Sequence, residues 1–277
     1  MTRREAVKAA EIRLAAAGVQ EAKITARYLF YFVTGLGWTD LLIDGSLPFD
    51  EKQQVYFDKL VEKRARHTPL QYLTGTQEFM GLEFFVNSNV LIPRQDTERL
   101  VEEVLDCCEK KSVLDLCTGS GCIIISLAKL KNLESACGCD LSEEALAVAK
   151  KNAEHCGVLV DFLQGDLFQP VNKTFDIIVS NPPYIKSEEI ETLMPEVRCH
   201  EPRMALDGMA DGLYFYRKII AKAPEYLKPK GKIFFEIGSS QAQEVAKLLF
   251  HGGFGDIKVK KDYAGLDRVI SAQKQDK

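Results

Sequence analysis

The sequence of 277 residues contains no long apolar run. Its longest apolar stretch, residues 122–128, includes a serine and is far too short to cross a bilayer, which takes about 20 residues in a helix. Residues 1–14 include acidic side chains where a secretory signal would need an apolar segment. We therefore expect a soluble protein of the cytoplasm with no membrane association.

Positive charge is not in excess either. The 36 Lys and Arg residues stand against 40 Asp and Glu residues, a net charge of −4. Residues 1–67 carry 11 basic and 9 acidic side chains, and the remainder carries 25 and 31. Stable binding of long nucleic acids normally uses a basic surface, so the composition argues against direct, stable nucleic-acid binding.

Metal-binding patterns are also missing. The eight cysteines include no pair of Cys-x-x-Cys units, and the four histidines do not complete a zinc spacing. Several of these cysteines lie in apolar, strand-like runs, where a free thiol behaves as a small hydrophobic side chain. We expect reduced thiols and no metal site.

Residues 1–68 predict a small helical bundle. Thr2 and Glu5 have the spacing of a capping box, and apolar residues follow at helical intervals. Two further amphipathic stretches cover residues 22–33 and 49–66. Residues 69–92 then include glycines and the β-rich run Leu82–Val86, which predicts a hairpin linking two domains.

Residues 93–277 alternate between strand and helix patterns. Helical stretches are expected at residues 121–130, 143–156 and 213–227, and strands at residues 113–116, 136–139, 160–163, 175–179 and 233–237. Such alternation implies a parallel sheet covered on both faces. Two late runs, residues 257–259 and 269–272, predict an antiparallel hairpin. The expected fold class is α/β, with a Rossmann-like domain after a helical bundle.

A glycine-containing loop, residues 115–121, leaves the first predicted strand of that sheet and opens a helix. Glycines let a backbone approach a ligand beside a helix N-terminus. A dinucleotide fingerprint would need glycine where Ile124 stands, and a P-loop would need Gly-Lys-Ser/Thr. The other interpretation is a tight turn without a ligand. The candidate ligand-binding residues of the loop are Cys117, Thr118, Gly119, Ser120 and Gly121.

Two acidic residues follow the next strands. Asp140 ends the second strand, where a carboxylate can accept hydrogen bonds from both hydroxyls of a ribose; Asp140 or Ser142 could instead cap the following helix. Asp166 lies after the third strand, beside Leu167 and Phe168. An acidic acceptor next to apolar side chains suits an adenine ring, although a solvated aspartate is the simpler interpretation.

The motif Asn181-Pro-Pro-Tyr184 directly follows the fourth strand. Two prolines restrict the backbone before any substrate arrives. The Asn181 side-chain oxygen and the Pro182 carbonyl can both accept hydrogen bonds from an NH₂ group, and Tyr184 can cover a flat conjugated group. Because the lone pair of an amide nitrogen is delocalised, two acceptors that hold both N–H bonds would direct that lone pair at an electrophile. A rigid turn is the alternative.

These residues resemble the class I S-adenosylmethionine-dependent methyltransferases that methylate nitrogen on planar substrates. Further segments make nearly the whole chain similar to the PrmC/HemK family, the peptide-chain release factor glutamine N5-methyltransferases. These segments are Gln71–Gly75, Glu78–Phe79, Ile92–Glu98, Glu201–Gly208, Glu236–Gly238 and Gly265–Val269. The chain departs from the family pattern at Cys117, where glycine is common, at Gln95 and at Leu167, where an aromatic residue often stands.

The resemblance implies an activity and a site. The methyl donor would be S-adenosyl-L-methionine, with S-adenosyl-L-homocysteine as product, and the acceptor the glutamine of the Gly-Gly-Gln motif in class-one release factors. The helical domain would help to bind that partner. Catalysis would involve Asn181, Pro182 and Tyr184. The donor would contact Cys117, Thr118, Gly119, Ser120, Gly121, Asp140, Asp166, Leu167 and Asn181, and the substrate Asn181, Pro182, Pro183 and Tyr184.

Two alternatives stay open at this stage. An amino-group methyltransferase acting on RNA or DNA would share the Asn-Pro-Pro-Tyr motif, but it would be expected to present a basic face. A non-catalytic adaptor of release factors or ribosomes would have no need for this motif beside an intact donor loop.

Overall fold

The structure, a computed structural model, describes residues 1–275. Contacts between residues divide the chain into two compact units. The first unit comprises Met1–Gly75 and, from much later in the chain, Met194–His200. The second comprises Thr76–Leu193 and the described residues from Glu201 onward. The return of residues 194–200 to the first unit was not anticipated from the sequence.

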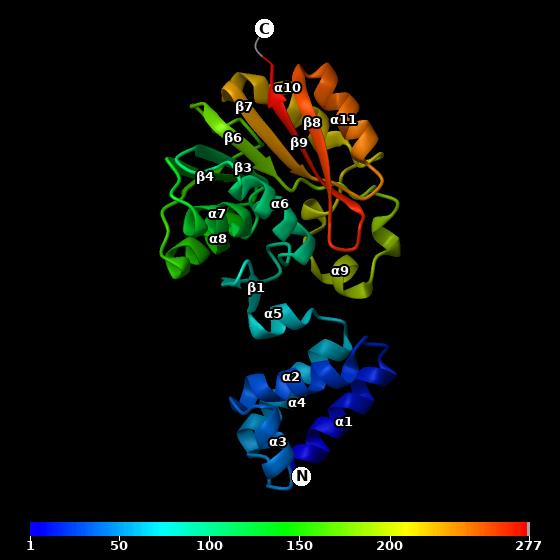
Figure 1. Cartoon of the computed structure of the whole chain (residues 1–277). Helices are drawn as coiled ribbons and strands as arrows, with labels where there is room; N and C mark the ends of the chain where they lie inside the picture. Colours follow the sequence, from blue (N-terminus) through cyan, green and yellow to red (C-terminus); the bar gives the residue numbers. More distant parts are fainter. Residues whose placement is uncertain (276–277) are drawn as a thin grey trace. The chain divides into compact units, whose positions relative to one another are not determined.

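The first unit is helical (Figure 1). The capping box predicted at Thr2 and Glu5 is confirmed: each residue's side chain accepts a hydrogen bond from the other's backbone N–H. The sequence pattern did not reveal α3 or α5. The helices of this unit are α1 (Arg3–Ala16), α2 (Ala22–Thr34), α3 (Trp38–Asp44), α4 (Glu51–Ala65), α5 (Leu70–Thr74) and α9 (Pro195–His200).

Three aromatic rings form the centre of this unit. Phe30 of α2 packs against Phe49 and Phe57, with ring centroids 5.3 Å and 6.3 Å away, and all three side chains are buried. Leu14 of α1 is also fully buried in this cluster. Burying side chains of this size is the main source of stability for a helical bundle this small.

The inserted helix α9 is held by an ion pair between a buried arginine and a partly buried glutamate. Arg64 of α4 donates to Glu196 Oε1 at 3.0 Å, and its other terminal nitrogen donates to the Thr68 carbonyl at 3.3 Å. His67 Nδ1 lies 3.6 Å from the same Glu196 oxygen. At the end of α9, His200 Nε2 lies 3.1 Å from the Arg66 carbonyl. These polar contacts lie within the first unit and hold residues 194–200 there, although the chain on either side of them belongs to the second unit.

The second unit begins with the predicted hairpin, which is confirmed. Strands β1 (Thr76–Phe79) and β2 (Leu82–Phe85) pair antiparallel. A helix that the sequence pattern did not reveal, α6 (Gln95–Leu105), follows. The hairpin is anchored to α8 (Glu143–Cys156), because Asn152 Oδ1 accepts a hydrogen bond from the Phe85 amide at 2.7 Å.

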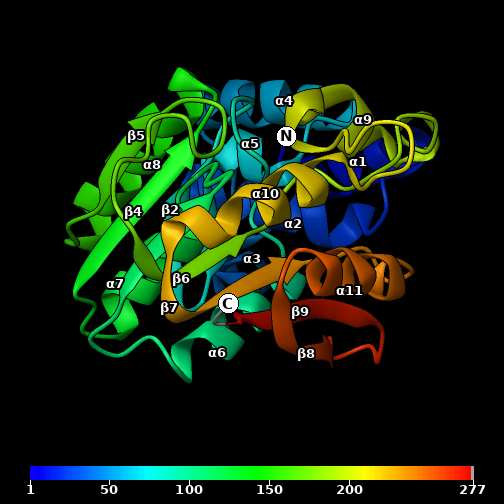
Figure 2. The same cartoon turned by 90° about the horizontal axis from the view of Figure 1, so that it is seen from above.

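A seven-stranded sheet forms the body of this unit (Figure 2). Its order is β5-β4-β3-β6-β7-β9-β8; the first five strands are parallel, and β9 is antiparallel to both neighbours. The predicted fold class and the predicted antiparallel end are confirmed. The strands are β3 (Ser112–Leu116), β4 (Ser135–Asp140), β5 (Asp161–Gln164), β6 (Phe175–Ser180), β7 (Leu227–Glu236), β8 (Phe254–Lys261) and β9 (Asp267–Lys274).

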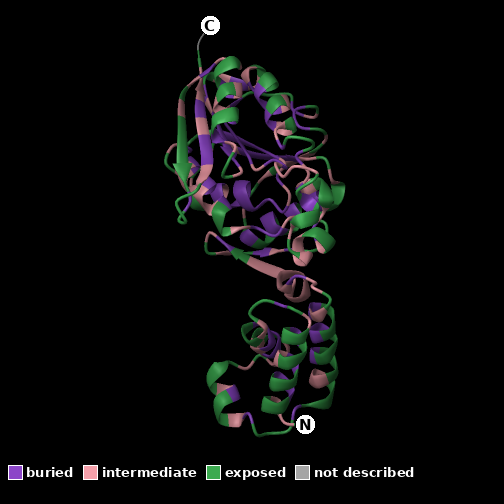
Figure 3. Cartoon of the chain, turned by 90° about the vertical axis from the view of Figure 1, so that its right-hand side faces the viewer, coloured by how far each residue is buried: buried purple, intermediate pink, exposed green. Residues whose placement is uncertain are grey.

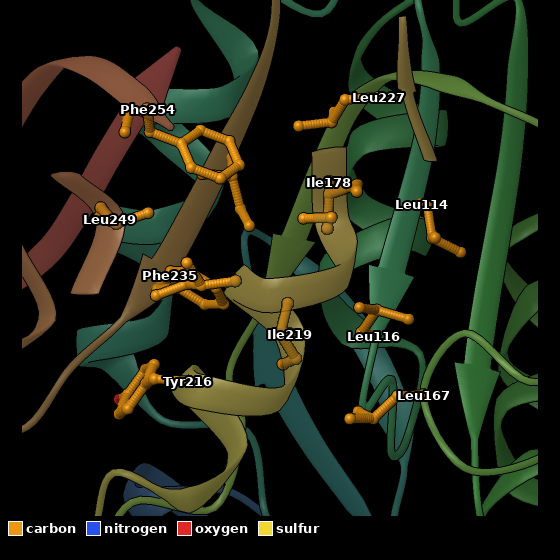
Figure 4. Packing of buried hydrophobic residues seen from close by; sticks show 14 of the residues in the cluster. Leu114, Leu116, Leu167, Ile178, Tyr216, Ile219, Leu227, Phe235, Leu249 and Phe254 are labelled. Carbon is orange, nitrogen blue, oxygen red and sulfur yellow. The ribbon is translucent and has the colours of Figure 1, made fainter. Parts of the chain in front are cut away.

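Helices cover both faces of the sheet. Helices α6, α7 (Cys122–Leu130) and α8 pack on one face, and α10 (Tyr214–Tyr226) and α11 (Ala242–His251) on the other. Strand alternation assigns side chains to these two cores: Leu114 and Leu116 point toward α10, where Figure 4 shows Leu116 near Ile219, whereas Val113 faces α6 and α7. Buried residues therefore occupy both sides of the sheet (Figure 3).

Neither a membrane span nor a disulfide is found among residues 1–275. No helix in that range has both the length and the apolar character to cross a membrane. The eight cysteines are all free. Cys137 and Cys139 are buried in β4, where they pack as small apolar side chains.

Removing the charge of Arg64 should destabilise the first unit, because Glu196 then loses its main partner in a largely buried position. We expect Arg64→Met to lower the free energy of unfolding by about 3 kcal/mol, measured by urea titration. Combining it with Glu196→Gln should cost less than the sum of the single changes. The exposed pair of Arg66 with Glu62 supplies the control, since Arg66→Met should cost less than about 1 kcal/mol. Equal costs for Arg64→Met and Arg66→Met would contradict a structural role for the buried pair.

Candidate active site

A cavity of about 440 Å³ opens at the carboxyl ends of the parallel strands. Between β3 and β6 the strand order reverses, and such switch points leave a crevice outside the sheet where ligands bind in α/β folds. The walls of the cavity include residues from loops that are far apart in the sequence. Among the predicted site residues, those that line it are Cys117, Gly119, Asp140, Asp166, Leu167, Asn181 and Pro183.

The loop between β3 and α7 forms one wall. Gly119 and Gly121 have φ values of +55° and +79°, which glycine adopts without strain. A Cβ on Gly121 would lie 2.7 Å from Ile125 Cδ1 and 3.2 Å from Ala149 Cβ, so glycine lets α7 and α8 approach closely. Thr118 and Ser120 are buried within the turn, and their predicted contacts with a donor stay predictions.

Cys117 has a left-handed backbone although it carries a side chain. Its φ is +60°, a conformation that costs a non-glycine residue about 1 kcal/mol or more. Burial raises the pKa of its thiol well above the ordinary value, with the charge of Asp140 acting in the same direction. The raised pKa favours the neutral thiol, and the residue contributes shape to the cavity wall.

Asp140 and Ser142 have separate roles, which the sequence left undecided. Ser142 caps α8 by accepting from the Ala145 amide at 3.0 Å. The Asp140 carboxylate accepts from the backbone N–H groups of Gly119 at 2.8 Å and Ser142 at 3.0 Å. Burial raises the pKa of Asp140, and these amide donors oppose that shift. Asp140 thus ties the loop after β3 to the end of β4 and still presents its carboxylate to the cavity.

The apolar wall differs in part from what the sequence suggested. Leu167 lines the cavity with a φ of +53°, and Asp166 beside it forms an ion pair with Lys218 at 2.7 Å. Phe168, one of the apolar side chains expected beside an adenine ring, instead stacks on Tyr226 within the core, with ring centroids 4.5 Å apart. Because of this stacking, the Phe168 ring does not line the cavity. It packs the loop against α10 instead.

The Asn181–Tyr184 turn leaves β6 at the edge of the same cavity. Asn181 Nδ2 donates to the Thr97 hydroxyl at 3.3 Å, while Pro182 is buried. Tyr184 is turned away: its hydroxyl donates to Glu236 Oε1 at 3.2 Å. It lines a second cavity of about 320 Å³, beside Gly238 and Gln241. Packing of Tyr184 against a substrate stays a prediction.

Two glycines pack closely against the backbone of Tyr184. A Cβ on Gly208 would lie 2.7 Å from Tyr184 Cα, and one on Gly212 would clash with the Tyr184 carbonyl oxygen. The backbone of Ile185 is also bonded to the facing segment: its amide donates to the Leu206 carbonyl at 3.0 Å, and its carbonyl accepts from the Gly208 amide at 2.7 Å. The turn is therefore fixed by close backbone packing as well as by its prolines.

Two further segments line the cavity that motif reasoning did not assign. They are residues 89–91 and a segment that includes Pro202–Ala205, Asp207 and Met209. An ion pair between Arg94 and the buried Glu201 joins the two segments close to the cavity. Residues 89–91 adjoin the family-like stretch Ile92–Glu98, and the second segment overlaps the stretch Glu201–Gly208. The resemblance of these two stretches to the family was the available sequence signal for this part of the cavity.

Asp115 is a fully buried carboxyl group beneath the loop. Thr118 donates to its Oδ2 at 2.6 Å, and Oδ1 has no hydrogen-bond partner among the described residues. Burial raises the pKa of Asp115 to about 8, an effect that Thr118 opposes and the charge of Asp140 reinforces. Asp115 is therefore protonated at neutral pH.

The stability of the protein should fall with rising pH because of Asp115. Between the ordinary carboxyl pKa and about 8, the folded state retains a proton that the unfolded state has lost. This proton makes the free energy of unfolding decrease by up to about 1.4 kcal/mol per pH unit. Asp115→Asn removes the titration while imitating the neutral carboxyl group. We expect a shallower pH dependence for the variant between pH 5 and 8, measured by urea titration; parallel curves would contradict the shift.

Comparison with known proteins gives consistent matches over the chain. Residues 5–75 match the family described as PrmC N-terminal domain, and residues 95–200 match the methyltransferase small domain. The chain is 44% identical over 262 residues to the release factor glutamine methyltransferase of Geobacter sulfurreducens, covering 94% of this chain and 92% of that protein. It is 40% identical over 279 residues to the protein of the same name from Bacillus subtilis, covering 97% and 96%.

The solved structures support the fold. A methyltransferase from Pyrococcus furiosus superimposes with a TM-score of 0.56 at 19% identity, covering 77% of this chain and 98% of that chain. At this level of identity the likeness concerns the arrangement of strands and helices alone. It agrees with the sheet order described above.

Proposed function

The chain belongs to the family of release factor glutamine methyltransferases, and we propose that it transfers a methyl group from S-adenosyl-L-methionine to the side-chain nitrogen (N5) of a glutamine. The acceptor is the glutamine of the Gly-Gly-Gln motif in class-one peptide-chain release factors, and S-adenosyl-L-homocysteine is the second product. The observation that carries this proposal is the Asn181–Tyr184 turn at the rim of the cavity described above.

The donor fits the chemistry of the cavity walls. Asp140 presents a carboxylate whose amide partners leave lone pairs for the ribose hydroxyls. Leu167 offers an apolar surface for adenine, and the loop at Cys117 and Gly119 faces the amino-acid end. The bound donor supplies an activated methyl group on a positively charged sulfur, so the protein mainly has to position the acceptor.

The acceptor amide is held at the turn after β6. The Asn181 oxygen and the Pro182 carbonyl accept one N–H bond each, which directs the nitrogen lone pair toward the methyl carbon. Transfer is then an in-line displacement in which a C–N bond forms as the C–S bond breaks. The methylated nitrogen is acidic and loses its proton afterwards.

Replacing Asn181 tests both the site and the reaction. We expect Asn181→Ala to lower methyl transfer to purified release factor by about 10²–10³, the usual cost of removing one preorganised polar group. Donor affinity, measured by calorimetry, should stay within a few-fold of wild type because Asp140 and the glycine loop are intact. Labelled donor should transfer methyl groups to release factor and not to total RNA. Near-normal turnover in the variant, or preferential labelling of RNA, would contradict the proposal.

We assign recognition of the release factor to residues 1–68, with residues 69–92 as linker. Within the first unit, α2 carries three apolar side chains at four-residue intervals on one exposed face: Ile24, Tyr28 and Phe32, which are 60%, 50% and 42% exposed. Residues four apart lie on one side of a helix. Contiguous exposed apolar side chains of this kind commonly mark protein interaction surfaces, which suits an enzyme with a protein substrate.

Shortening the exposed side chains of this surface should lower methylation of the intact release factor and leave methylation of a short peptide unchanged. We expect Tyr28→Ala with Phe32→Ala to lower kcat/KM for whole release factor by about 10-fold or more, since buried aromatic contacts dominate interface energies. A short peptide containing the Gly-Gly-Gln sequence should be methylated as by wild type. Phe250→Ala, at an even more exposed aromatic on α11, serves as the control. Equal efficiency of wild type and the double variant on release factor would exclude this surface.

The cytoplasm is the proposed location, in keeping with the release factor as partner. Absence of stable nucleic-acid binding stays a prediction. The RNA arm of the transfer assay tests methylation of RNA, and a binding titration with total RNA tests stable nucleic-acid binding.

A further inference from the structure

Gln241 stands directly before α11, but its side chain does not serve that helix. A side chain at this position commonly accepts hydrogen bonds from the first turn of the helix, and the Gln241 side chain makes no such bond. Its amide group contacts three other places in the backbone instead. Gln241 is partly buried, so capping of its own helix does not explain where this amide is held.

The Gln241 amide joins three segments through hydrogen bonds of ordinary length. Its Nε2 donates to the Tyr184 carbonyl at 3.0 Å and to the Gly212 carbonyl at 3.2 Å. Its Oε1 accepts from the Gly238 amide at 2.9 Å. Tyr184 follows β6, Gly238 follows β7 and Gly212 precedes α10. One side chain therefore links the segment after β6 to two segments that are distant from it in the sequence.

These bonds allow only one orientation of the Gln241 amide. A side-chain amide has a donor end with two hydrogens and an acceptor end, whereas a carbonyl oxygen can only accept. Here the acceptor end meets a backbone N–H and the donor end meets two carbonyl oxygens. With the amide turned by 180°, all three contacts would be repulsive. The arrangement therefore involves no titratable group.

Gly212 leaves the space that this bridge requires. Its φ is +73°, a conformation that glycine adopts without strain. A Cβ on Gly212 would clash with the Tyr184 carbonyl oxygen and would lie 2.7 Å from Gln241 Nε2. The bridge thus depends on the absence of a side chain at position 212 as well as on the amide at position 241.

The Asn181–Tyr184 turn has little means of holding itself. Its two prolines have no N–H, so the backbone between its ends can accept hydrogen bonds but cannot donate them. The position of the turn is therefore set at its flanks. On the first flank, Ser180 is paired within the sheet, in β6. On the second flank, the carbonyl of Tyr184 is bonded to Gln241.

We propose that Gln241 is a positioning residue for methyl transfer: through the backbone of Tyr184 it holds the Pro182 carbonyl where the acceptor amide binds. The inference rests on the proposed function for the role of that carbonyl, but the hydrogen bonds themselves do not depend on it. Gln241 lines the second cavity rather than the one assigned to the donor. Loss of its bonds should therefore change the placement of the acceptor and leave donor binding intact.

The decisive variant is Gln241→Glu, which keeps the shape and the acceptor but replaces the NH₂ group with oxygen. The carboxylate then faces the carbonyl oxygens of Tyr184 and Gly212, and both contacts become repulsive. We expect kcat for release factor to fall by about 10- to 100-fold, because a shift of about 1 Å can cost that much in rate. Donor affinity, measured by calorimetry, should stay close to that of wild type.

A second variant, Gln241→Lys, restores the donors without the amide. An ammonium group has three hydrogens to donate, so it can satisfy both carbonyl oxygens while losing only the bond from Gly238. We expect its kcat to exceed that of Gln241→Glu by about 5-fold or more, since it keeps the Tyr184 backbone in place. Equal losses in the two variants would contradict the proposal.

The control is Gln243→Glu, the same change two residues later in α11. Gln243 is exposed and lies outside the linings of both cavities, so kcat should stay near wild type. Urea titration checks that each variant is folded, and kcat is compared at temperatures below unfolding. A loss in Gln243→Glu as large as that in Gln241→Glu would assign the effect to added charge and overturn the role of the bridge.

A measurement without substrate separates this inference from the proposed function. In protein labelled with 3-fluorotyrosine, the ¹⁹F signal of Tyr184, assigned with Tyr184→Phe, should shift or broaden in Gln241→Glu. It should match wild type in Gln243→Glu. An unchanged Tyr184 signal in Gln241→Glu, or full kcat in that variant, would overturn the role of Gln241. The expected signals together with absence of transfer to release factor by wild type would count against the proposed function alone.

Discussion

The reversal of strand order between β3 and β6 is the constraint on which the site depends. Because β4 and β5 extend the sheet in one direction and β6 and β7 in the other, the loops after β3 and β6 separate and leave a cavity between them. The same reversal places the glycine loop and Asp140 on one side of the cavity and Asn181 on the other. The groups proposed to bind the donor and the acceptor therefore face one cavity.

Buried polar groups give this space its definite shape. Asp140 joins two loops through backbone amides, and the protonated Asp115 supports the turn from below through Thr118. On the other side of the cavity, Glu236 accepts from the hydroxyl of Tyr184, and the Thr97 hydroxyl accepts from Asn181. Each arrangement costs desolvation energy, and each orients a group that otherwise has several rotamers of similar energy. Orientation, rather than added stability, is the benefit that such networks bring to a reaction governed by positioning.

The backbone adds a second form of preorganisation. Cys117 and Leu167 both have left-handed backbones, although neither is glycine, and both line the cavity. Gly208 and Gly212 approach the Tyr184 backbone so closely that a methyl group would not fit. Strained or tightly packed backbone of this kind persists only where the surrounding structure imposes it. At Cys117 and Leu167 this constraint acts on the cavity wall itself.

The sequence by itself determined the alternation of strands and helices, the capping box at Thr2 and the antiparallel end of the sheet. These features follow from local periodicity and from hydrogen bonds between near neighbours. Its motifs also marked seven residues that line the cavity. Only the tertiary structure decided that Phe168 stacks on Tyr226, that Tyr184 turns toward Glu236, and that residues 194–200 join the first unit. It alone brought Thr97 to Asn181 and Glu236 to Tyr184 from distant segments. Such contacts depend on how whole elements pack, and no pattern along the chain records which of two possible neighbours a side chain will meet.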